Sequence, residues 1–476
     1  MNGSDRENDA RENEGHRSIR NVSIRRAIST SLASKVSTAV LQFVSLPVAA
    51  RAMGREEFGI YATVSTAVLL VLILQMGVGP ALARGISSAA ARRDRDREAL
   101  FFWNGAFLVG LLVFLGMVIG AVFVLYVPIP LLFGEEYRGW EPEMKSGIWT
   151  GLVLIGGLLL VSHTDRVREG YMEAYTVNAW GAFGNLVGAA AVFVGVRYFP
   201  SVPFLLLAIY CPNVLARVAN SVFLLRDRRY LLKRENVRFD RSTIRELVGD
   251  GVSFSATTFF VYVVEFGLCG LLIGRLAGPG EVAVFQVLMT VTTSFEGLLT
   301  MVGTPVWAAL ADAKEKNDIS WMKDSIQRYY RYLFLLTVAV GLGEIALGPI
   351  LFPWWYGEEF SVGRAVFAGH ALFLAALGWR EVNRFITVGL GLLPKTVWPI
   401  LGGAAAGLIL GVPGMHLFGM SALFIGLGVG ALFVPGLILP IQIRKVLMQG
   451  LQKESEAHPS VDSSLTQATS PSALRQ

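Results

Sequence analysis

Long apolar stretches alternate with short polar segments from about residue 28 to residue 446. A stretch of about 20 apolar residues is what an α-helix needs to cross the hydrocarbon core of a bilayer. The first half of the chain contains six such stretches, over residues 28–49, 58–82, 100–126, 148–163, 176–198 and 202–225. The second half contains six more, over residues 251–274, 281–309, 329–347, 362–388, 396–416 and 420–443. The pattern predicts an all-α polytopic membrane protein with about 12 transmembrane helices in two six-helix lobes.

The composition agrees with this pattern and excludes a water-soluble enzyme. Hydrophobic residues make up 53% of the 476 residues and charged residues 16%, whereas soluble domains carry about 25% charged residues. An outer-membrane β-barrel would show segments of about ten alternating residues instead of long apolar runs. The 51 glycines favour helices that pack closely inside a bilayer.

Basic residues are divided unevenly between the two sides of the membrane that twelve spans would define. Segments on the side of the N-terminus hold 33 Lys and Arg residues, against seven on the opposite side. Because basic residues favour the cytoplasmic side, we expect both termini in the cytoplasm. The net charge of +6 is therefore a topology signal, and nucleic acid is not expected as a partner.

These features divide the chain into five parts. Residues 1–27 and 447–476 are polar with few apolar residues, so we predict disordered cytoplasmic tails. Residues 28–225 form a predicted N-lobe and residues 251–446 a predicted C-lobe, each with six transmembrane helices. Residues 226–250 are rich in Lys and Arg and form a predicted basic cytoplasmic linker.

The two predicted lobes repeat each other in sequence. Seven positions within residues 51–61 match positions within residues 275–285, every pair at an offset of 224. The sequence GEEY at residues 134–137 recurs as GEEF at residues 357–360, at an offset of 223. Because each lobe has an even number of spans, this internal parallel repeat predicts two lobes of the same orientation, related by an axis along the membrane normal.

Four segments resemble a known family. They are ARAMGREEFGIY (50–61), MGVGPALAR (76–84), LFGE (132–135) and IREL (244–247). In this order they resemble bacterial polysaccharide-exporting flippases, which move lipid-linked repeat units of O-antigen, capsule or related glycans. This family belongs to a larger superfamily shared with multidrug extruders and lipid II flippases. The resemblance implies two six-helix lobes and a central cavity that opens alternately to either side.

The resemblance also implies a function. The protein would translocate polyprenyl-diphosphate-linked oligosaccharide from the cytoplasmic to the outer leaflet of the bacterial inner membrane, for the biosynthesis of a cell-surface polysaccharide such as lipopolysaccharide. Its partners would be this lipid-linked oligosaccharide and membrane lipids, with a glycan polymerase and glycosyltransferases as further candidates. Three alternatives remain open: a cation-coupled multidrug extruder, a membrane-embedded glycan polymerase or glycosyltransferase, and a scaffold that recruits glycan enzymes.

A charged residue inside an apolar span is costly in a bilayer, so each one is a candidate for function. Lys35 lies on a polar stripe of the first span together with Ser31, Thr38, Gln42 and Ser45. We predict that its cation attracts the diphosphate of the substrate as a point charge. The alternative is that Lys35 snorkels toward the cytoplasmic headgroups.

Arg217 and two asparagines are the next candidates for substrate binding. Arg217 shares a face of the sixth span with Asn213, and Asn178 lies on the preceding span. A guanidinium matches phosphate bidentately, and amides donate to and accept from glycan hydroxyls. For the asparagines, hydrogen bonding from helix to helix is the alternative.

Two acids lie in the middle of predicted spans. Glu265 and Glu296 fall on polar stripes of the seventh and eighth spans, the repeat counterparts of the first and second. A carboxyl in such a place is neutral or exchanges a proton, so we predict that these acids couple transport to an ion. The alternative is a buried acid that pairs with an arginine or is hydrogen-bonded as a neutral group.

The tenth span carries two arginines in its cytoplasmic half. Arg380 and Arg384 are four residues apart, with Glu381 between them. Two cations one helical turn apart repel each other unless an anion lies between them. We therefore predict either binding of a substrate phosphate at the cytoplasmic entrance or structural pairing with Glu381.

The remaining sequence shows no sign of catalytic chemistry. The five histidines are scattered, no closely spaced His and Cys set suggests a metal, and no phosphate-binding Gly-Lys-Ser/Thr loop occurs. We expect no catalytic residue, no metal and no cofactor, and a transporter that ATP does not drive within this chain.

Overall fold

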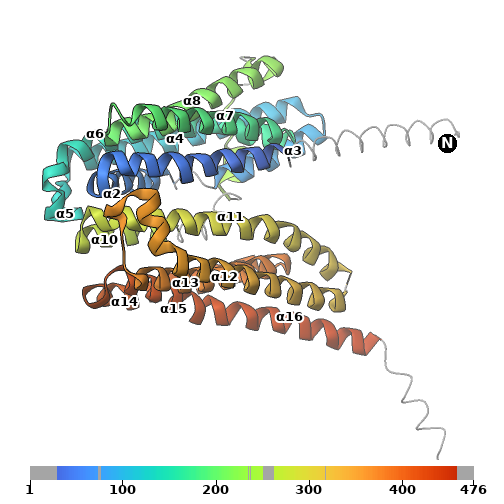
Figure 1. The fold of residues 1–476 in the computed structure, drawn as a ribbon. Coiled ribbons are helices and arrows are strands. Elements are labelled where there is room, and N and C mark those ends of the chain that lie inside the picture. Colours follow the sequence, from blue (N-terminus) through green and yellow to red (C-terminus); the bar gives the residue numbers. More distant parts are fainter. Residues whose placement is uncertain are drawn as a thin grey trace, which may run out of the picture. The chain divides into compact units, whose positions relative to one another are not determined.

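A computed structural model describes residues 29–72, 77–233, 235, 237–249, 262–316 and 318–457. Every regular element in these ranges is a helix (Figure 1). The prediction of an all-α membrane protein is confirmed for this part of the chain. The predicted tail 1–27 lies outside the described residues, and so do residues 458–476 of the other tail.

The first half of the chain begins with a helix over residues 29–40. The elements that follow are η1 (Leu41–Ser45), α2 (Leu46–Leu72), α3 (Val78–Ala91), α4 (Arg95–Tyr126), α5 (Ile129–Phe133), η3 (Glu135–Trp140), α6 (Glu141–Gly170), α7 (Ala174–Gly195), α8 (Val202–Asp227) and η4 (Arg229–Leu232). Helix α2 is kinked at Gly54, whose backbone is not helical. The kink separates the first predicted span from the second.

The second half is described from residue 262 onward. Its elements are η6 (Tyr262–Leu268), α10 (Cys269–Ala277), α11 (Pro279–Glu315), α12 (Ile319–Tyr356), η7 (Glu358–Phe360), α13 (Arg364–Gly389), η8 (Leu393–Lys395), α14 (Val397–Phe418), α15 (Met420–Phe433) and α16 (Pro435–Ala457). The described residues of each predicted span thus coincide with helical structure; residue 28 of the first span, residues 73–76 of the second and residues 251–261 of the seventh lie outside the described part.

Several helices are longer than the apolar runs that predicted them. Helix α6 extends beyond 148–163 at both ends, and α12 extends beyond 329–347. Helix α16 continues to Ala457, whereas the sequence placed a disordered tail from residue 447. An apolar run marks only the part of a helix that lies in the hydrocarbon core. Polar side-chain pairs stabilise the helical turns beyond it. One such pair is Lys145 with Glu141, at 2.8 Å in the first turn of α6.

The described residues group into two compact units. Unit 1 comprises those within Met1–Thr290 and Pro349–Val362, and unit 2 those within Val291–Gly348 and Gly363–Gln476. The units differ from the predicted lobes, because parts of the predicted C-lobe belong to unit 1. Contact between the two halves of the repeat agrees with this grouping: Arg275 Nη1 donates to the carbonyl of Leu131 at 2.5 Å.

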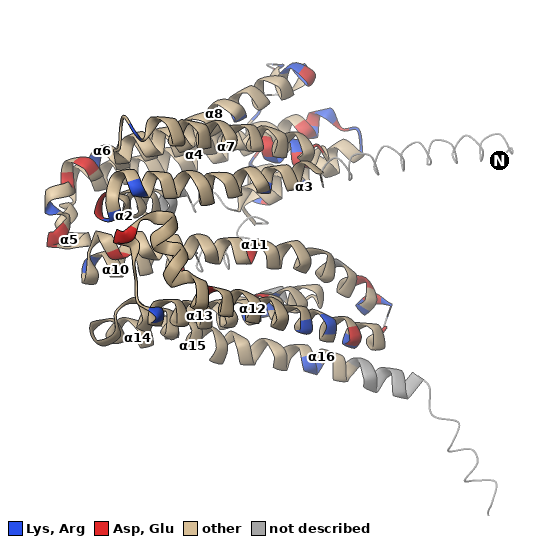
Figure 2. Cartoon of the chain, viewed as in Figure 1, with Lys and Arg blue, Asp and Glu red and all other residues tan. Residues whose placement is uncertain are grey.

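The distribution of polar and apolar side chains is that of a membrane protein. In Figure 2 the charged positions lie mostly near helix ends, and long uncharged stretches form the helix middles. Within the described residues, nine helical segments are long and apolar enough to cross a membrane. Large apolar side chains such as Phe114, Leu125 and Leu342 are more than half exposed. Such side chains are suited to contact with lipid tails.

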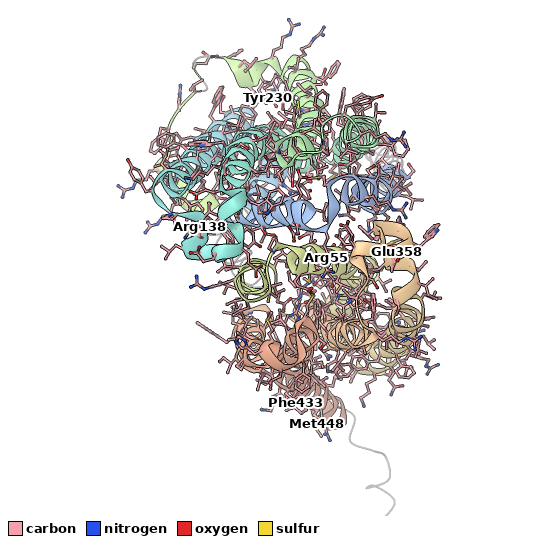
Figure 3. All side chains as sticks on the ribbon, turned by 60° about the vertical axis from the view of Figure 1, so that its left-hand side comes forward. Arg55, Arg138, Tyr230, Glu358, Phe433 and Met448 are labelled. Atoms are coloured by element: carbon pink, nitrogen blue, oxygen red, sulfur yellow. The ribbon has the colours of Figure 1, made fainter. Side chains whose placement is uncertain are left out.

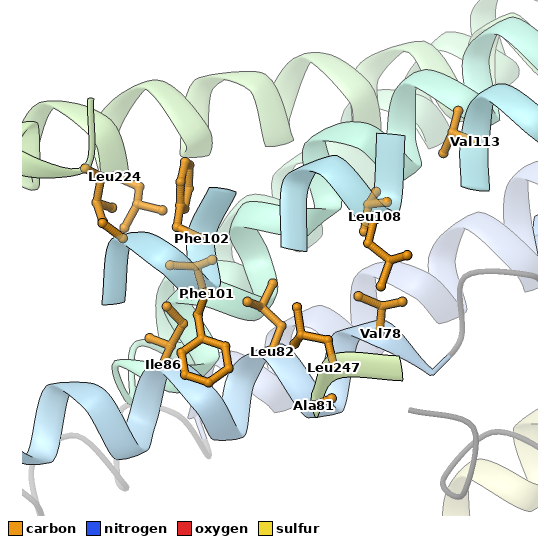
Figure 4. Packing of buried hydrophobic residues seen from close by; sticks show 14 residues of the cluster. Val78, Ala81, Leu82, Ile86, Phe101, Phe102, Leu108, Val113, Leu224 and Leu247 are labelled. Carbon is orange, nitrogen blue, oxygen red and sulfur yellow. The ribbon is translucent and has the colours of Figure 1, made fainter. Parts of the chain in front are cut away.

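Buried apolar side chains pack together in unit 1, where Leu82, Ile86 and Phe101 belong to one cluster (Figure 4).

Close helix packing in unit 2 depends on glycine, as the glycine content predicts. In unit 2, a β-carbon added to Gly426 would lie 2.5 Å from the Gly411 backbone. Helices α14 and α15 therefore approach each other backbone to backbone, which only glycine permits at these positions.

Candidate functional site

A buried ion pair joins two helices of unit 1. Asp165 lies on α6 with its side chain 5% exposed, and Arg217 Nη1 of α8 donates to Asp165 Oδ2. Asn220 Nδ2, one turn further along α8, donates to Asp165 Oδ1 at 2.8 Å. The carboxylate is thus paired on both oxygens, as a buried charge requires.

A second group of charges continues from this pair along the same helices. Arg168 Nη2 donates to the carbonyl of Asn220 at 3.2 Å, and its Nη1 donates to Glu173 at 2.6 Å. Arg228, after the end of α8, donates to the other oxygen of Glu173 at 2.5 Å. These cations and acids balance one another where α6 and α8 end.

Two tyrosines next to this group share one acid. Tyr171 Oη donates to Glu98 Oε2 at 2.5 Å, and the hydroxyl of Tyr230 donates to the same oxygen. Burial, and then the hydrogen bond to Glu98, raise the pKa of Tyr230 to about 12. The same causes place the pKa of Tyr171 well above its ordinary value. Both hydroxyls therefore remain protonated donors at neutral pH.

The structure brings only some of the predicted unit 1 residues together. Asn213 is buried, donates to the Ile209 carbonyl of its own helix at 3.0 Å and packs against Gly184 of α7. These contacts agree with the helix-packing alternative for Asn213. Asn178 is half-buried on α7, and Lys35 is exposed on the helix over residues 29–40.

The polar stripe of the first span is partly used for helix packing. Thr38 accepts a hydrogen bond from Asn185 Nδ2 of α7 at 2.9 Å, and Ser45 Oγ donates to the Ala189 carbonyl at 3.2 Å. Lys35 lies on this stripe one turn before Thr38, but its own side chain is exposed. A role for Lys35 in substrate binding stays a prediction.

Four charged residues of unit 2, on α11 and α13, form one group. Glu381 accepts from Arg380 Nε at 3.2 Å and from Arg384 Nε at 2.7 Å. Arg380 Nη2 also lies 3.9 Å from Glu296 Oε1, and Arg380 is almost fully buried. Glu381 therefore bridges the two arginines, which agrees with the structural alternative. Arg384 is 29% exposed and retains an accessible face for an anion.

The two predicted acids differ in their surroundings. Glu265 is buried in η6, which belongs to unit 1. The Glu296 side chain is 23% exposed on the part of α11 that belongs to unit 2, where it faces Arg380. These surroundings do not test the predicted role of Glu265 and Glu296 in ion coupling, which stays a prediction.

The sequence interpretation missed two buried acids. Asp165 lies two residues beyond the predicted end of the fourth span, so it was assigned to a loop. Glu344 lies inside the predicted ninth span, and its Oε1 is 2.5 Å from His370 Nδ1. The rule that singles out a charge within a span would have found Glu344. Pairing with His370 could not be seen, because the two residues are on different helices.

A third polar cluster in unit 1 joins Arg55 to its repeat counterpart around Gly280 and Glu281 and to the GEEF turn at residues 357–360. Arg55 Nη2 lies 2.5 Å from Glu281 Oε1, Nε donates to the Gly280 carbonyl at 3.0 Å, and Nη1 donates to the Glu359 carbonyl at 2.9 Å. The backbone N–H of Arg55 also donates to Glu359 Oε2 at 3.0 Å. Figure 3 shows Arg55 beside the turn that carries Glu358. The residues belong to different halves of the repeat.

No group of three or more His, Cys, Asp and Glu side chains in the described ranges could hold a metal ion. The polar clusters offer ion pairs and hydrogen-bond donors instead. Guanidinium and amide groups of this kind bind anions and polar head groups.

Several solved structures of membrane transporters are similar to this chain in fold. An inward-facing multidrug resistance transporter of the MATE family, within the MOP superfamily, aligns with a TM-score of 0.69 over 87% of this chain and 98% of its own, at 12% identity. An outward-facing MATE transporter aligns with a TM-score of 0.58 over 89% and 96%, at 12% identity. A Pyrococcus furiosus MOP-superfamily transporter, described as having a binding pocket of reverse polarity, gives 0.59 over 88% and 96%, at 13% identity. The fold of this chain is therefore similar to that of these transporters.

The family follows from the sequence. The model of the polysaccharide biosynthesis protein family matches residues 24–308, and the chain belongs to this family. No curated protein sequence matches the chain. Family and fold together support a multi-pass membrane exporter rather than an enzyme.

Proposed function

We propose that this protein is a flippase that moves polyprenyl-diphosphate-linked oligosaccharide from the cytoplasmic to the outer leaflet of the bacterial inner membrane. The observation that carries the proposal is the match of residues 24–308 to a polysaccharide biosynthesis family on a transporter fold. An exporter that serves polysaccharide biosynthesis needs a substrate that is both glycan and membrane-bound. A lipid-linked oligosaccharide meets both requirements.

The cationic residues support a substrate with a diphosphate. Lys35 is exposed on its helix, and Arg384 is partly exposed beside Glu381. Arg217 has a buried Nε without a hydrogen-bond partner among the described residues, in addition to its bond to Asp165. A guanidinium with an unused donor is suited to a phosphate oxygen. We propose that Lys35 and Arg217 in unit 1 and Arg384 in unit 2 each bind a phosphate of the substrate, and that Asn178 binds its sugars. The contacts of Arg380 and Asn213 agree with their structural alternatives.

The proposal includes a direction and partners. Both termini lie in the cytoplasm, and two lobes alternate in access while Glu265 and Glu296 couple the movement to an ion. Glycosyltransferases would supply the lipid-linked oligosaccharide on the cytoplasmic side. A glycan polymerase would consume it in the outer leaflet.

Proteoliposomes test the proposal directly. The purified protein is reconstituted with a lipid-linked oligosaccharide whose glycan is fluorescent, and a membrane-impermeant reagent quenches the label in the outer leaflet. We expect the protected fraction to fall with time only when the protein is present. Equal rates with and without the protein would contradict the proposal.

A multidrug extruder is the second candidate, and one observation favours it. The solved structures with this fold include multidrug resistance transporters. The same proteoliposomes loaded with a fluorescent lipophilic cation separate the two functions. A flippase leaves the cation where it is, whereas an extruder moves the cation and not the glycan lipid.

A further inference from the structure

Three buried polar side chains of unit 2 meet between α11, α12 and α13. His370 Nδ1 lies 2.5 Å from Glu344 Oε1, and His370 Nε2 lies 2.8 Å from Thr292 Oγ1. The histidine side chain is fully buried, and the glutamate side chain is 7% exposed. Each ring nitrogen thus has one partner, with an acid on one side and a hydroxyl on the other. These two contacts fix the orientation of the ring.

The second oxygen of Glu344 has no hydrogen-bond partner among the described residues. This oxygen, Oε2, is buried. A buried carboxylate that is left with an unsatisfied oxygen is costly. A proton on this carboxyl would remove the negative charge and most of the cost.

Among the described residues, the rings that pack against His370 are aromatic and uncharged. Helix α15 contributes the ring of Phe424, 4.7 Å from the His370 ring, and contains no titratable residue. Helix α13 adds Phe373. Charged residues also lie on the unit 2 parts of the three helices that carry this group. Glu296 and Arg380 face each other at 3.9 Å, and Glu381 and Arg384 pair with each other. The others are Asp312, Lys314 and Glu315 on α11, Arg364 on α13, and Lys323, Asp324, Arg328 and Arg331 on α12. Exchange of a proton changes the charge of the Glu344–His370 pair itself.

The net charge of this pair depends on one proton. With one exchangeable proton shared between the carboxyl and the imidazole, the pair is neutral overall. Loss of that proton leaves a net negative charge, and a second proton leaves a net positive charge. Burial opposes both charged states. The closed pair therefore holds its proton, and hydration of the site lets the proton exchange with water.

We propose that Glu344, His370 and Thr292 form a proton-binding site that takes one proton from water, holds it while buried and returns it to water when the site is hydrated. Hard metal cations such as Mg²⁺ and Ca²⁺ take six or more oxygen ligands, whereas this group has a nitrogen at its centre and few oxygens. The proposal that this site binds a proton does not depend on the proposed flippase function. The coupling of that proton to transport rests on the proposed flippase function.

Proton binding is measured first, without any substrate. The protein is labelled with ¹⁵N-histidine, placed in lipid nanodiscs and titrated by NMR between about pH 5 and 9. The His370→Gln variant identifies the resonances of His370. We expect these resonances to report a change of protonation in the wild type and a shifted midpoint in Glu344→Gln. Resonances of His370 that stay constant over the whole range would overturn the proposal.

Two further variants keep the test valid if a Gln variant misfolds. Thr292→Val removes the hydroxyl at nearly constant volume, so the His370 midpoint should move while the acid–base pair remains. His163→Gln is the matched control, because His163 is equally buried and contacts the Phe102 carbonyl at 2.9 Å. It should leave the His370 titration unchanged. An unchanged His370 midpoint in both Thr292→Val and Glu344→Gln would contradict the site.

Transport then separates this proposal from the proposed function. Flipping by the wild type should fall about tenfold per pH unit on the alkaline side of its midpoint, as a single required proton predicts. Glu344→Gln and His370→Gln should make the rate independent of pH, and His163→Gln should keep the wild-type slope. A wild-type slope in both Gln variants would refute coupling through this site and leave the flippase intact. Titration of His370 in a wild type that flips no glycan lipid would support the site and refute the flippase.

Discussion

Gly54 and Gly278, which are 224 residues apart, have the same unusual backbone conformation. Their φ and ψ angles are 80° and 170° for Gly54, and 82° and 175° for Gly278. In each case a carboxylate from the other half of the repeat lies against the glycine, Glu359 at Gly54 and Glu136 at Gly278. The sequence repeat is therefore also a structural repeat, and the two halves exchange equivalent contacts at these turns.

Substitution of these glycines should destabilise the protein. The conformation is one that L-residues rarely adopt, at a cost of about 1–3 kcal/mol. Gly278→Ala should cost more than Gly54→Ala, since a β-carbon at Gly278 would overlap the Glu136 carboxylate, whereas one at Gly54 would lie 3.3 Å from Glu359. Thermal unfolding in detergent measures both. The control is Gly297→Ala on α11, where a β-carbon meets open space and alanine favours the helix.

Arg55 should stabilise unit 1 through several bonds at once. Arg55→Gln removes the ion pair with Glu281 and the bonds to two carbonyls, so we expect a loss of roughly 1–3 kcal/mol. Arg55→Lys should recover less than half of this loss, because an ammonium cannot reproduce the planar fork. Unfolding midpoints of Arg55→Gln, Glu281→Gln and the double variant give the coupling energy. A coupling near zero would reduce the pair to a surface contact.

The fold follows from the sequence because hydrocarbon-length apolar runs permit only helices. Helix ends do not follow, since a helix continues past the bilayer wherever polar residues support it, and this hid Asp165 in a supposed loop. Within one helix, the pairing of Arg380 and Arg384 with Glu381 was visible from their spacing. The pairs Asp165–Arg217 and Glu344–His370 join different helices, and no local spacing encodes which helices are neighbours.

Glu265 and Glu296 can be separated from the His370 site by ion dependence. We expect the double variant Glu265→Gln, Glu296→Gln to change the dependence of flipping on sodium or pH, because both titratable groups are removed while size is kept. Flipping rates are measured over a sodium series at fixed pH and over a pH series at fixed sodium. If the double variant keeps the wild-type dependence on sodium and on pH, while Glu344→Gln loses the pH slope, coupling is assigned to the His370 site alone.

The pair of Asp165 and Arg217 offers a test of structural against functional roles. Arg217→Gln leaves a buried carboxylate with only Asn220 as a side-chain donor, and breaking a buried pair costs about 3–5 kcal/mol. Since Arg217 is 23% exposed, we expect the lower end of that range. Asp165→Asn combined with Arg217→Gln replaces the ion pair by two neutral amides and should recover most of the stability. Thermal unfolding of the two single variants and the double variant measures this.

Flipping by the same variants then decides whether Arg217 binds the diphosphate. If it does, the double variant is stable but flips a diphosphate-linked oligosaccharide at least about tenfold more slowly, the loss of about 1.4 kcal/mol expected for one charge-assisted bond. Lys35→Gln should show the same loss with little change in stability, because Lys35 is exposed, and Lys35→Arg should retain much of the activity since it keeps the cation. A glycan on a neutral lipid serves as the control substrate and should be unaffected. A double variant that is stable and flips the diphosphate-linked donor at the wild-type rate would make the ion pair purely structural.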